Sequence, residues 1–502
     1  MSPFRSLPFL AIAFALSVLK AEASKPNIIF ILADDLGVQD VGFMGSKYFE
    51  TPVLDELAED SLVFENAFMY PTCSPSRAAI LTGQQSFRTG CYTVPVLEKG
   101  NAEDNIFSRW TVGTEHPVYS QPLREAGYKQ IHLGKWHIVG PHPDQESATE
   151  FPLQKALKQP ANGDLSWLPA HRSPEIQKYY PNGRGFDENI GGTWWGDPSR
   201  GYQKGYNAPG GGYVAPFKNP FIEEKENDEW LTDRLTSDAI DFIDRHKNGP
   251  FFVNLHYYAP HMPSVPRSEG SMRHFMTKPA DSSTGQGQAK GKSRESIAAY
   301  ATMVKSIDDN LRRLLDYLDQ AALRENTVII FSSDNGFNGR QSVNGNLRGA
   351  KGHIYDGGLR VPALINWPGV VKARRDETPI HGLDLFPTFL DLAGMDDYQG
   401  PLDGNSLLPL MKGQPFADRY LYWQISSTYK NPPCSIIRKN QWKLIQFLKD
   451  GSTELYNTDQ DPKESKDLSK HQPEMAQELL KQLESWRKEN KVPLPPSSPL
   501  NH

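Results

Sequence analysis

Cysteine and a strong charge of one sign are both scarce in this chain of 502 residues. Its three cysteines are Cys73, Cys91 and Cys434, so at least one thiol lies outside any internal disulfide. The 54 Lys and Arg residues face 60 Asp and Glu residues, which gives a formal net charge of −6. This balance argues against a nucleic-acid partner bound through a global basic field, but it permits a local cationic pocket for a small anion. With 38% hydrophobic and 11% aromatic residues, wholesale disorder is excluded.

Two further absences concern membranes and glycosylation. After the N-terminal region, no apolar run is long enough to span a bilayer, which predicts a soluble protein with no membrane partner. No Asn-X-Ser/Thr acceptor occurs anywhere in the chain. This absence favours a bacterial periplasmic or secreted protein over a glycosylated lumenal one.

The first 23 residues have the features of a signal peptide. Arg5 provides a basic start, residues 7–19 form an apolar stretch too short to cross a membrane, and small residues precede a cleavage point. We therefore expect export, with residues 1–23 removed and a mature chain that begins near Ser24. An uncleaved anchor is the alternative.

Length and periodicity predict the fold class. The chain is longer than one small core needs, so we expect a large catalytic domain, 24–413, and a smaller α+β subdomain, 414–502. Four apolar runs that end in chemically useful polar residues occupy 27–33, 129–133, 251–256 and 327–331. Predicted helices alternate with them at 52–59, 75–81, 231–245 and 295–323. The alternation predicts an α/β fold, a doubly wound and mostly parallel sheet whose ligand crevice lies at the carboxyl ends of its strands.

Other stretches depart from this alternation. Residues 140–224 are rich in Pro, Gly, Tyr and Trp without a sustained period, and we expect a long insertion that faces the substrate over the crevice. The composition of residues 280–294 predicts a mobile surface loop. After Gly413, short strands at 420–424, 435–438 and 442–447 and a helix at 473–489 predict a small antiparallel sheet closed by a helix.

Cys73 stands directly before a predicted helix. Ser74 is a plausible N-cap, Pro75 occupies the first turn and Gly83 ends the helix. The helix start offers N–H donors and a positive dipole end, which favour negative charge at position 73. Arg77, one turn along, faces the same side. By itself, a cysteine before a helix is more often structural than reactive.

Four oxygen-bearing side chains follow two of the apolar runs. Asp34 and Asp35 come after the first run, and Asp334 and Asn335 come after the fourth. Two carboxylates about 4 Å apart repel by about 4 kcal/mol at an effective dielectric constant of about 20, so three together need a cation. Oxygen ligands indicate a hard ion, Ca²⁺ rather than Mg²⁺. Alternatively, these residues cap helices and never meet.

The segment from Cys73 to Gly83 resembles the signature of the type I, formylglycine-dependent sulfatases, which belong to the alkaline phosphatase-like superfamily. In that family the cysteine is oxidised to formylglycine, or 3-oxoalanine. The resemblance covers about residues 25–491, with the motifs in the same order as in the family. Besides the first strand through Asp35, it includes Gly134-Lys-Trp-His137, Pro260-His-Met-Pro263, Asp334-Asn-Gly336, Arg348-Gly-Ala-Lys351, Gly357-Gly-Leu-Arg-Val-Pro362, Leu455-Tyr456 and Asp461-Pro462.

The resemblance implies one Ca²⁺ per chain and a modified residue at Cys73. The metal ligands would be Asp34, Asp35, Asp334, Asn335 and the modified Cys73. A formylglycine-generating enzyme would be a partner during maturation.

The resemblance also implies a mechanism. One hydroxyl of the hydrated aldehyde at position 73, polarised by the metal and by Arg77, attacks sulfur. His261 or Lys351 supplies or stabilises the proton on the departing alcohol. His137 then removes the proton of the second hydroxyl, and sulfate is expelled. A serine at position 73 could attack but has no second hydroxyl for this step.

The cationic residues suit an anionic ester. With Ca²⁺, the side chains of Arg77, Lys135 and Lys351 outweigh three aspartates and leave the site positive, which fits a monoanionic sulfate ester. Lys135, His261 and Lys351 would also bind the substrate. Taken singly, each Lys and His has an ordinary structural interpretation as a solvated or hydrogen-bonded side chain.

Three remaining residue groups have lesser roles. Asp356 stands where the family resemblance leads us to expect Glu, which would shift a supporting contact without abolishing activity. Asp384, in the family-like segment 381–388, is interpreted as a helix cap or hydrogen-bond acceptor. If Cys73 is modified, Cys91 and Cys434 remain as a possible disulfide pair.

The insertion suggests the substrate class. Its aromatic residues, among them Trp194 and Trp195, would bind sugar faces, while nearby Arg and Lys residues would hold anionic groups. We therefore expect a polysaccharide sulfatase that removes sulfate from a sulfated oligo- or polysaccharide. The alternative is that these aromatics only hold a long loop in place.

Two other functions stay open at this point. One is a phosphonate or phosphate ester hydrolase of the same superfamily, since some of these resemble the chain at Cys-x-Pro-x-Arg. The other is a sulfated-glycan binding protein in which Cys73 stays a thiol.

Overall fold

The computed structural model describes residues 25–143, 160–204, 209–281, 293–339 and 347–501. The predicted signal peptide, most of the predicted loop 280–294 and two parts of the insertion, 144–159 and 205–208, lie outside the described residues. Among the helices of the described segments, none combines the length and the apolar character that crossing a membrane requires.

A large sheet forms the centre of the molecule. In the described part of the chain it has nine strands, in the order β4-β3-β5-β1-β6-β7-β2-β8, with β9 beside β2. The strands from β4 to β6 in this order are parallel, and β7 is antiparallel to both β6 and β2. Their bounds are β1 Asn27–Ala33, β2 Leu62–Phe68, β3 Lys129–Gly134, β4 Glu188–Ile190, β5 Phe251–His256, β6 Thr327–Ser333, β7 Arg360–Asn366, β8 Arg374–Asp376 and β9 Ile380–His381. The mostly parallel sheet predicted from the sequence is confirmed.

Helices cover both faces of this sheet. β1 is buried along its whole length, because its alternate side chains enter two different cores. Ile29 and Ile31 pack in the core that contains α1, α9, α10 and α11, whereas Ile28 and Phe30 pack in the core that contains α2, α4 and α13. The helix bounds are α1 Pro52–Glu59, α2 Cys73–Thr82, α4 Ser120–Glu125, α9 Leu231–His246, α10 Glu269–Thr277, α11 Arg294–Gln320 and α13 Leu385–Leu392. The chain is thus doubly wound.

Shorter helices connect these elements. They are α3 Ser86–Thr89, α7 Leu168–His171, α8 Pro174–Gln177, α12 Asp356–Leu359 and α14 Leu408–Met411. The insertion 140–224 contributes α7, α8 and β4. Because β4 pairs with β3, part of the insertion belongs to the large sheet instead of lying only above it.

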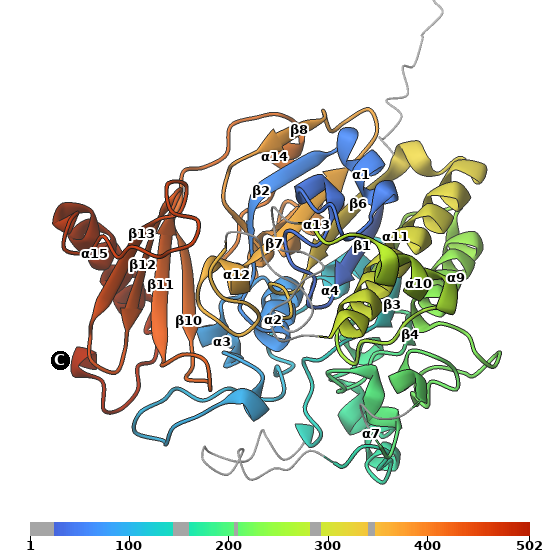
Figure 1. Ribbon diagram of the computed structural model, residues 1–502, viewed down its shortest axis with the longest axis horizontal. Coiled ribbons are helices and arrows are strands. Elements are labelled where there is room, and N and C mark those ends of the chain that lie inside the picture. Colours follow the sequence, from blue (N-terminus) through green and yellow to red (C-terminus); the bar gives the residue numbers. More distant parts are fainter. Residues whose placement is uncertain (1–24, 144–159, 205–208, 282–292, 340–346, 502) are drawn as a thin grey trace, which may run out of the picture.

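The C-terminal residues form the expected small antiparallel sheet. Its strands are β10 Leu421–Ile425, β11 Cys434–Lys439, β12 Trp442–Phe447 and β13 Thr453–Asn457, and the helix α15 is Pro473–Asn490. Figure 1 shows this sheet, in orange and red, between α15 and the large domain. Ile437 and Leu444 face Leu479 and Leu483 of α15, while residues on the opposite face, including Ile436 and Trp423, pack against the large domain.

The possible disulfide between Cys91 and Cys434 is not formed in the structure. Cys91 and Cys434 are both buried thiols in the structure. Cys91 belongs to the core beneath α2, whereas Cys434 lies in the core between the large domain and the small sheet. Each therefore packs as a small apolar side chain in a different cluster.

Candidate active site

The carboxyl ends of β1, β3, β5 and β6 meet the amino end of α2. This convergence follows from the parallel sheet, in which the residues after each strand come out at the same edge. Among the predicted site residues, those with side chains essentially removed from solvent are Asp34, Asp35, Cys73, Arg77, Lys135, Asp334 and Asn335. His137 is also buried, and His261 and Lys351 keep 13% and 18% of their side chains exposed.

Cys73 is the first residue of α2, so the helix begins two residues before the predicted start at residue 75. The N-cap is Thr72, in an extended conformation and without a side-chain capping bond, so the prediction of Ser74 as the cap is wrong. Gly83 ends the helix with φ +65°, a left-handed conformation that glycine adopts without strain. Burial, despite the opposing charges of Lys135 and Lys351, raises the pKa of the Cys73 thiol. An unmodified thiol here would therefore be a poor nucleophile.

Arg77 is held in one orientation beside Cys73. Its Nε donates to Oδ2 of Asp334 at 2.9 Å, and Nη2 lies 2.8 Å from the same oxygen. Nη1 donates to the carbonyl of Lys135 at 2.8 Å. Burial disfavours the charge, but Asp334 and Asp34 raise the pKa of Arg77, so the guanidinium stays charged.

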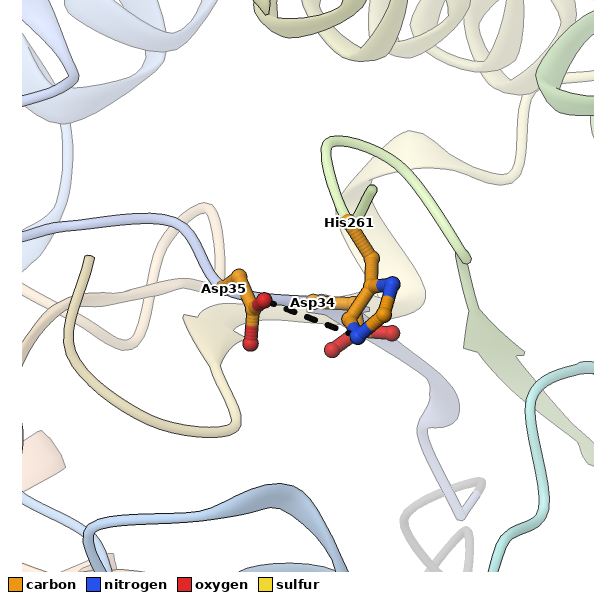
Figure 2. A group of neighbouring side chains, drawn as sticks. All are labelled: Asp34, Asp35 and His261. Atoms are coloured by element: carbon orange, nitrogen blue, oxygen red, sulfur yellow. Dashed lines mark ion pairs between the residues drawn. The ribbon is translucent and has the colours of Figure 1, made fainter. Parts of the chain in front are cut away.

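The acidic side chains form the cluster expected from the sequence. Asp35 has φ +65° and donates its backbone N–H to Oδ1 of Asp334 at 3.2 Å, while Nδ2 of Asn335 donates to Oδ1 of Asp35 at 2.9 Å. One ligand atom each from Asp34, Cys73 and Asp334 lie within 4.8 Å of one another. The same holds for Asp34, Asp35 and His261, shown in Figure 2 with the imidazole turned toward the carboxylates.

Several buried oxygens of this cluster have no hydrogen-bond donor among the described residues. They are Oδ1 of Asp34, Oδ2 of Asp35 and Oδ1 of Asn335. Burial, and then the nearby Asp334 carboxylate, raise the pKa of Asp34 well above its usual range, although Lys135 opposes this shift. Buried oxygens without donors are costly unless a cation satisfies them, so this donor set fits a hard divalent ion.

Two lysines and a histidine surround the acidic cluster. Nζ of Lys135 lies 2.6 Å from Oδ2 of Asp34, and Nζ of Lys351 lies 2.6 Å from Oδ1 of Asp35. Burial works against the Asp35 charge, but Lys351 and His261 hold the pKa of this carboxyl below its usual range. Conversely, Asp35 overcomes burial and raises the pKa of Lys351 well above its usual value. Lys351 therefore keeps its proton.

The two histidines of the site differ in their surroundings. Nδ1 of His261 lies 2.7 Å from the carbonyl of Met262 and donates to it, which leaves Nε2 facing Oδ2 of Asp35 at 3.6 Å. Burial and then Lys351 lower the pKa of His261 to about 4. His137 has φ +56°, and burial followed by Lys135 lowers its pKa well below the usual value. Both rings are therefore neutral near pH 7 without substrate.

The structure adds residues that the sequence did not single out. His256, at the end of β5, lies 3.2 Å through Nδ1 from Nη1 of Arg77. Tyr300 of α11 donates to Oδ2 of Asp40 at 2.7 Å and lies 3.3 Å from the carbonyl of Asp35. Gly196 of the insertion packs on His137, since a Cβ there would lie 2.8 Å from the ring. Of these three residues, only His256 had a signal in the sequence, namely its position at the end of an apolar run.

The predicted sugar-stacking role of Trp194 and Trp195 is not supported by their positions. Their exposed fractions are 2% and 1%, and both pack near Trp167 in the core beneath α2. The rings stabilise the insertion and have no face open to a ligand. The structural alternative therefore describes them better.

The side chains of Asp384 and Asp356 both have structural contacts. Asp384 accepts from the backbone N–H of His381 at 2.8 Å and of Asn405 at 2.9 Å, as expected for a structural acceptor. Asp356 is buried and pairs with Arg438 at 3.0 Å and Lys443 at 2.8 Å. It thus connects the loop after Lys351 to the small sheet.

The comparisons with known proteins agree with this geometry. Residues 26–395 match the sulfatase family model, and residues 350–489 match the model described as N-sulphoglucosamine sulphohydrolase, C-terminal. A sulfatase of Formosa agariphila is 27% identical over 93% of this chain and 90% of its own length. An N-acetylgalactosamine-6-O-sulfatase of Bacteroides thetaiotaomicron is 26% identical over 92% and 93%, respectively.

A solved structure extends the similarity to three dimensions. The crystal structure of Ps i-CgsB has a TM-score of 0.68 and 30% sequence identity, over 92% of this chain and 93% of that one. The same protein has been solved in complex with k-i-k-neocarrahexaose. The fold is that of the alkaline phosphatase-like superfamily, and the family model spans most of the chain. The chain therefore belongs to the sulfatase family and is a sulfuric ester hydrolase.

Proposed function

We propose that this sulfatase removes sulfate from a sulfated oligo- or polysaccharide by using formylglycine, formed from Cys73, and one bound Ca²⁺. The observation that carries the proposal is the meeting of Cys73 with Asp34 and Asp334 inside 4.8 Å, directly beside Arg77. A family-wide fold would not by itself require these side chains to converge. Their convergence supports a site in which position 73 is both metal ligand and reacting group.

The unsatisfied oxygens support the metal part of the proposal. Asp34, Asp35, Asp334 and Asn335 would hold Ca²⁺ together with an oxygen at position 73. When bound, the ion would act as a Lewis acid on nearby oxygens, and the hydrated aldehyde at position 73 would supply the attacking hydroxyl. The ion would also contact the buried carboxylate and amide oxygens that have no hydrogen-bond donor among the described residues.

The chain's own residues would bind the sulfate group and move the protons. Arg77, Lys135 and Lys351 would orient the sulfate, since all three are basic side chains fixed by ion pairs or hydrogen bonds. Neutral His137 would accept the proton whose removal expels sulfate from position 73. Because this base is buried next to cations, it stays unprotonated until the reaction places a proton beside it.

His261 and Lys351 would act on the departing oxygen. Nε2 of His261 faces the cluster, and the negative charge of a bound sulfate would favour its protonated form. His261 would then give this proton to the alcohol, while the ammonium of Lys351 stabilises the negative charge that develops on the same oxygen.

The substrate class is supported by the relatives. One acts, by its name, on N-acetylgalactosamine 6-sulfate, and another structure holds a neocarrahexaose. We therefore propose a sulfated glycan as the substrate. The signal-peptide-like sequence of residues 1–23 and the bacterial relatives support a proposal of export to the periplasm or medium, with maturation by a formylglycine-generating enzyme. We keep the domain limits 24–413 and 414–502 as part of this proposal.

Matched esters test the proposed activity. Protein from a host able to modify Cys73 is assayed with sulfate, phosphate and phosphonate esters of the same alcohol. We expect the highest kcat/KM for the sulfate ester. A preference for a phosphorus ester would contradict the sulfate chemistry, and tight glycan binding without turnover by an unmodified protein would favour a binding function.

A further inference from the structure

Two strongly exposed large hydrophobic side chains lie on neighbouring segments of the chain. Val96 and Tyr429 expose 57% and 59% of their surface, more than the third such residue of the described segments, Leu165, at 39%. Their segments, 94–99 of the large domain and 427–431 of the small subdomain, are joined by a β-bridge between Glu98 and Thr428. The backbone N–H of Tyr429 also donates to the carbonyl of Leu97 at 3.3 Å. We call these two segments the rim.

Both halves of the rim are attached to the candidate active site. Thr93, directly before the first segment, lies 3.2 Å through its hydroxyl from that of Thr72, the residue before Cys73. In the second segment, Nζ of Lys430 donates to the carbonyl of Lys351, and Nδ2 of Asn431 donates to the carbonyl of Gly352 at 2.6 Å. The rim therefore adjoins the site from two independent directions.

The chemistry of the rim suits a sulfated sugar. Tyr429 is largely exposed, and Nζ of Lys430 lies over one face of its ring, 5.5 Å from the ring centre. Aromatic faces pack against the C–H faces of sugars, and an ammonium beside them attracts sulfate. Lys430, but not Tyr429, also lines a neighbouring cavity of about 400 Å³ together with Tyr355, Phe447, Lys449 and Asp450. This volume has room for a sugar unit.

We infer that the rim is a subsite for the sugar that neighbours the one losing its sulfate, with Tyr429 as the stacking ring and Lys430 as the anion contact. The inference rests on the proposed function and adds where the rest of the glycan lies. Specificity for a chain over a small ester would thus come from the C-terminal subdomain instead of from Trp194 and Trp195.

A ratio of activities tests the subsite. For wild type, Tyr429→Ala and Tyr429→Phe, kcat/KM is measured on 4-nitrophenyl sulfate and on oligosaccharides released from carrageenan and from chondroitin 6-sulfate. For Tyr429→Ala, the ratio of oligosaccharide to aryl sulfate kcat/KM should fall about five- to tenfold, the loss expected for one stacking contact. Tyr429→Phe keeps the ring and should keep the ratio.

A matched control addresses the competing location. Tyr202 lines a cavity of about 740 Å³ in the insertion, together with Lys204 and Lys218. Tyr202→Ala should leave the ratio at the wild-type value. A drop in this ratio for Tyr202→Ala but not for Tyr429→Ala would overturn the inference. So would wild-type protein with modified Cys73 that hydrolyses the aryl sulfate but neither glycan. Absence of hydrolysis of every sulfate ester by modified protein would instead contradict the proposed function itself.

Discussion

Nη1 of Arg77 donates a hydrogen bond to Nδ1 of His256 at 3.2 Å, and both side chains are fully buried. A guanidinium has donors only, so Nδ1 of His256 must be the acceptor and the neutral ring carries its proton on Nε2. Burial and then the Arg77 charge lower the pKa of His256 well below its usual value, in agreement with a neutral ring. We predict that His256 is a positioning residue that holds Arg77 toward position 73.

Removing this acceptor should slow catalysis. We expect His256→Leu to lower kcat roughly 10- to 100-fold, because a small displacement of a fixed cation costs transition-state stabilisation. His256→Gln keeps an acceptor and should recover part of the loss. Steady-state kinetics with thermal unfolding as a control for folding measures both. Wild-type kcat in a folded His256→Leu protein would exclude the positioning role.

Cys73→Ser should react once and stop. A serine hydroxyl can attack sulfur, but it has no second hydroxyl from which His137 could take a proton to expel sulfate. Intact-protein mass spectrometry after incubation with substrate should find a sulfate ester at position 73. Continued turnover by this variant would show that the second hydroxyl is unnecessary.

Metal removal should abolish activity and reduce stability. The buried carboxylates of Asp34, Asp35 and Asp334 would lose the ion that offsets their repulsion. We expect chelation to reduce turnover to background, to lower the melting temperature, and to be reversed by Ca²⁺. Metal analysis of the treated protein supplies the control. Unchanged activity in a protein verified to be metal-free would refute the cation site.

The dependence of the rate on the leaving group should reveal whether His261 donates a proton. A sugar alkoxide needs a proton more than an acidic phenolate does. For His261→Ala, the loss in kcat should therefore be larger with a sugar sulfate than with 4-nitrophenyl sulfate, by roughly tenfold or more. The measurement is a plot of log kcat against leaving-group pKa for a series of phenyl sulfates. Its slope shows how strongly the rate depends on protonation of the leaving group. Equal losses across the series would place His261 outside proton transfer.

Much of the site could be predicted because strand ends are visible in the sequence. β1, β5 and β12 and the helix α1 have the predicted bounds, since each is an uninterrupted pattern with a clear end. Asp34, Lys135, His261 and Asp334 follow such strands, so a parallel sheet brings them together. The sequence assigned no role to His256, because a histidine that ends an apolar run also fits an ordinary core residue.

The missed elements have local causes. β2 contains Glu65 and Asn66, and its register with β7 shifts at this point, so the apolar pattern is interrupted. β7 contains Pro362, which argues against a strand when only the sequence is considered. The direction of Trp194 and Trp195 was misjudged because aromatic composition does not tell which side of a loop faces the core.

The state of position 73 is the most direct test of the account. Peptide mass spectrometry on protein from a modifying host should find an aldehyde, CHO, in place of the CH₂SH of Cys73. Turnover of a sulfate ester should rise in proportion to the modified fraction. Full turnover by protein whose Cys73 remains entirely a thiol would contradict the account.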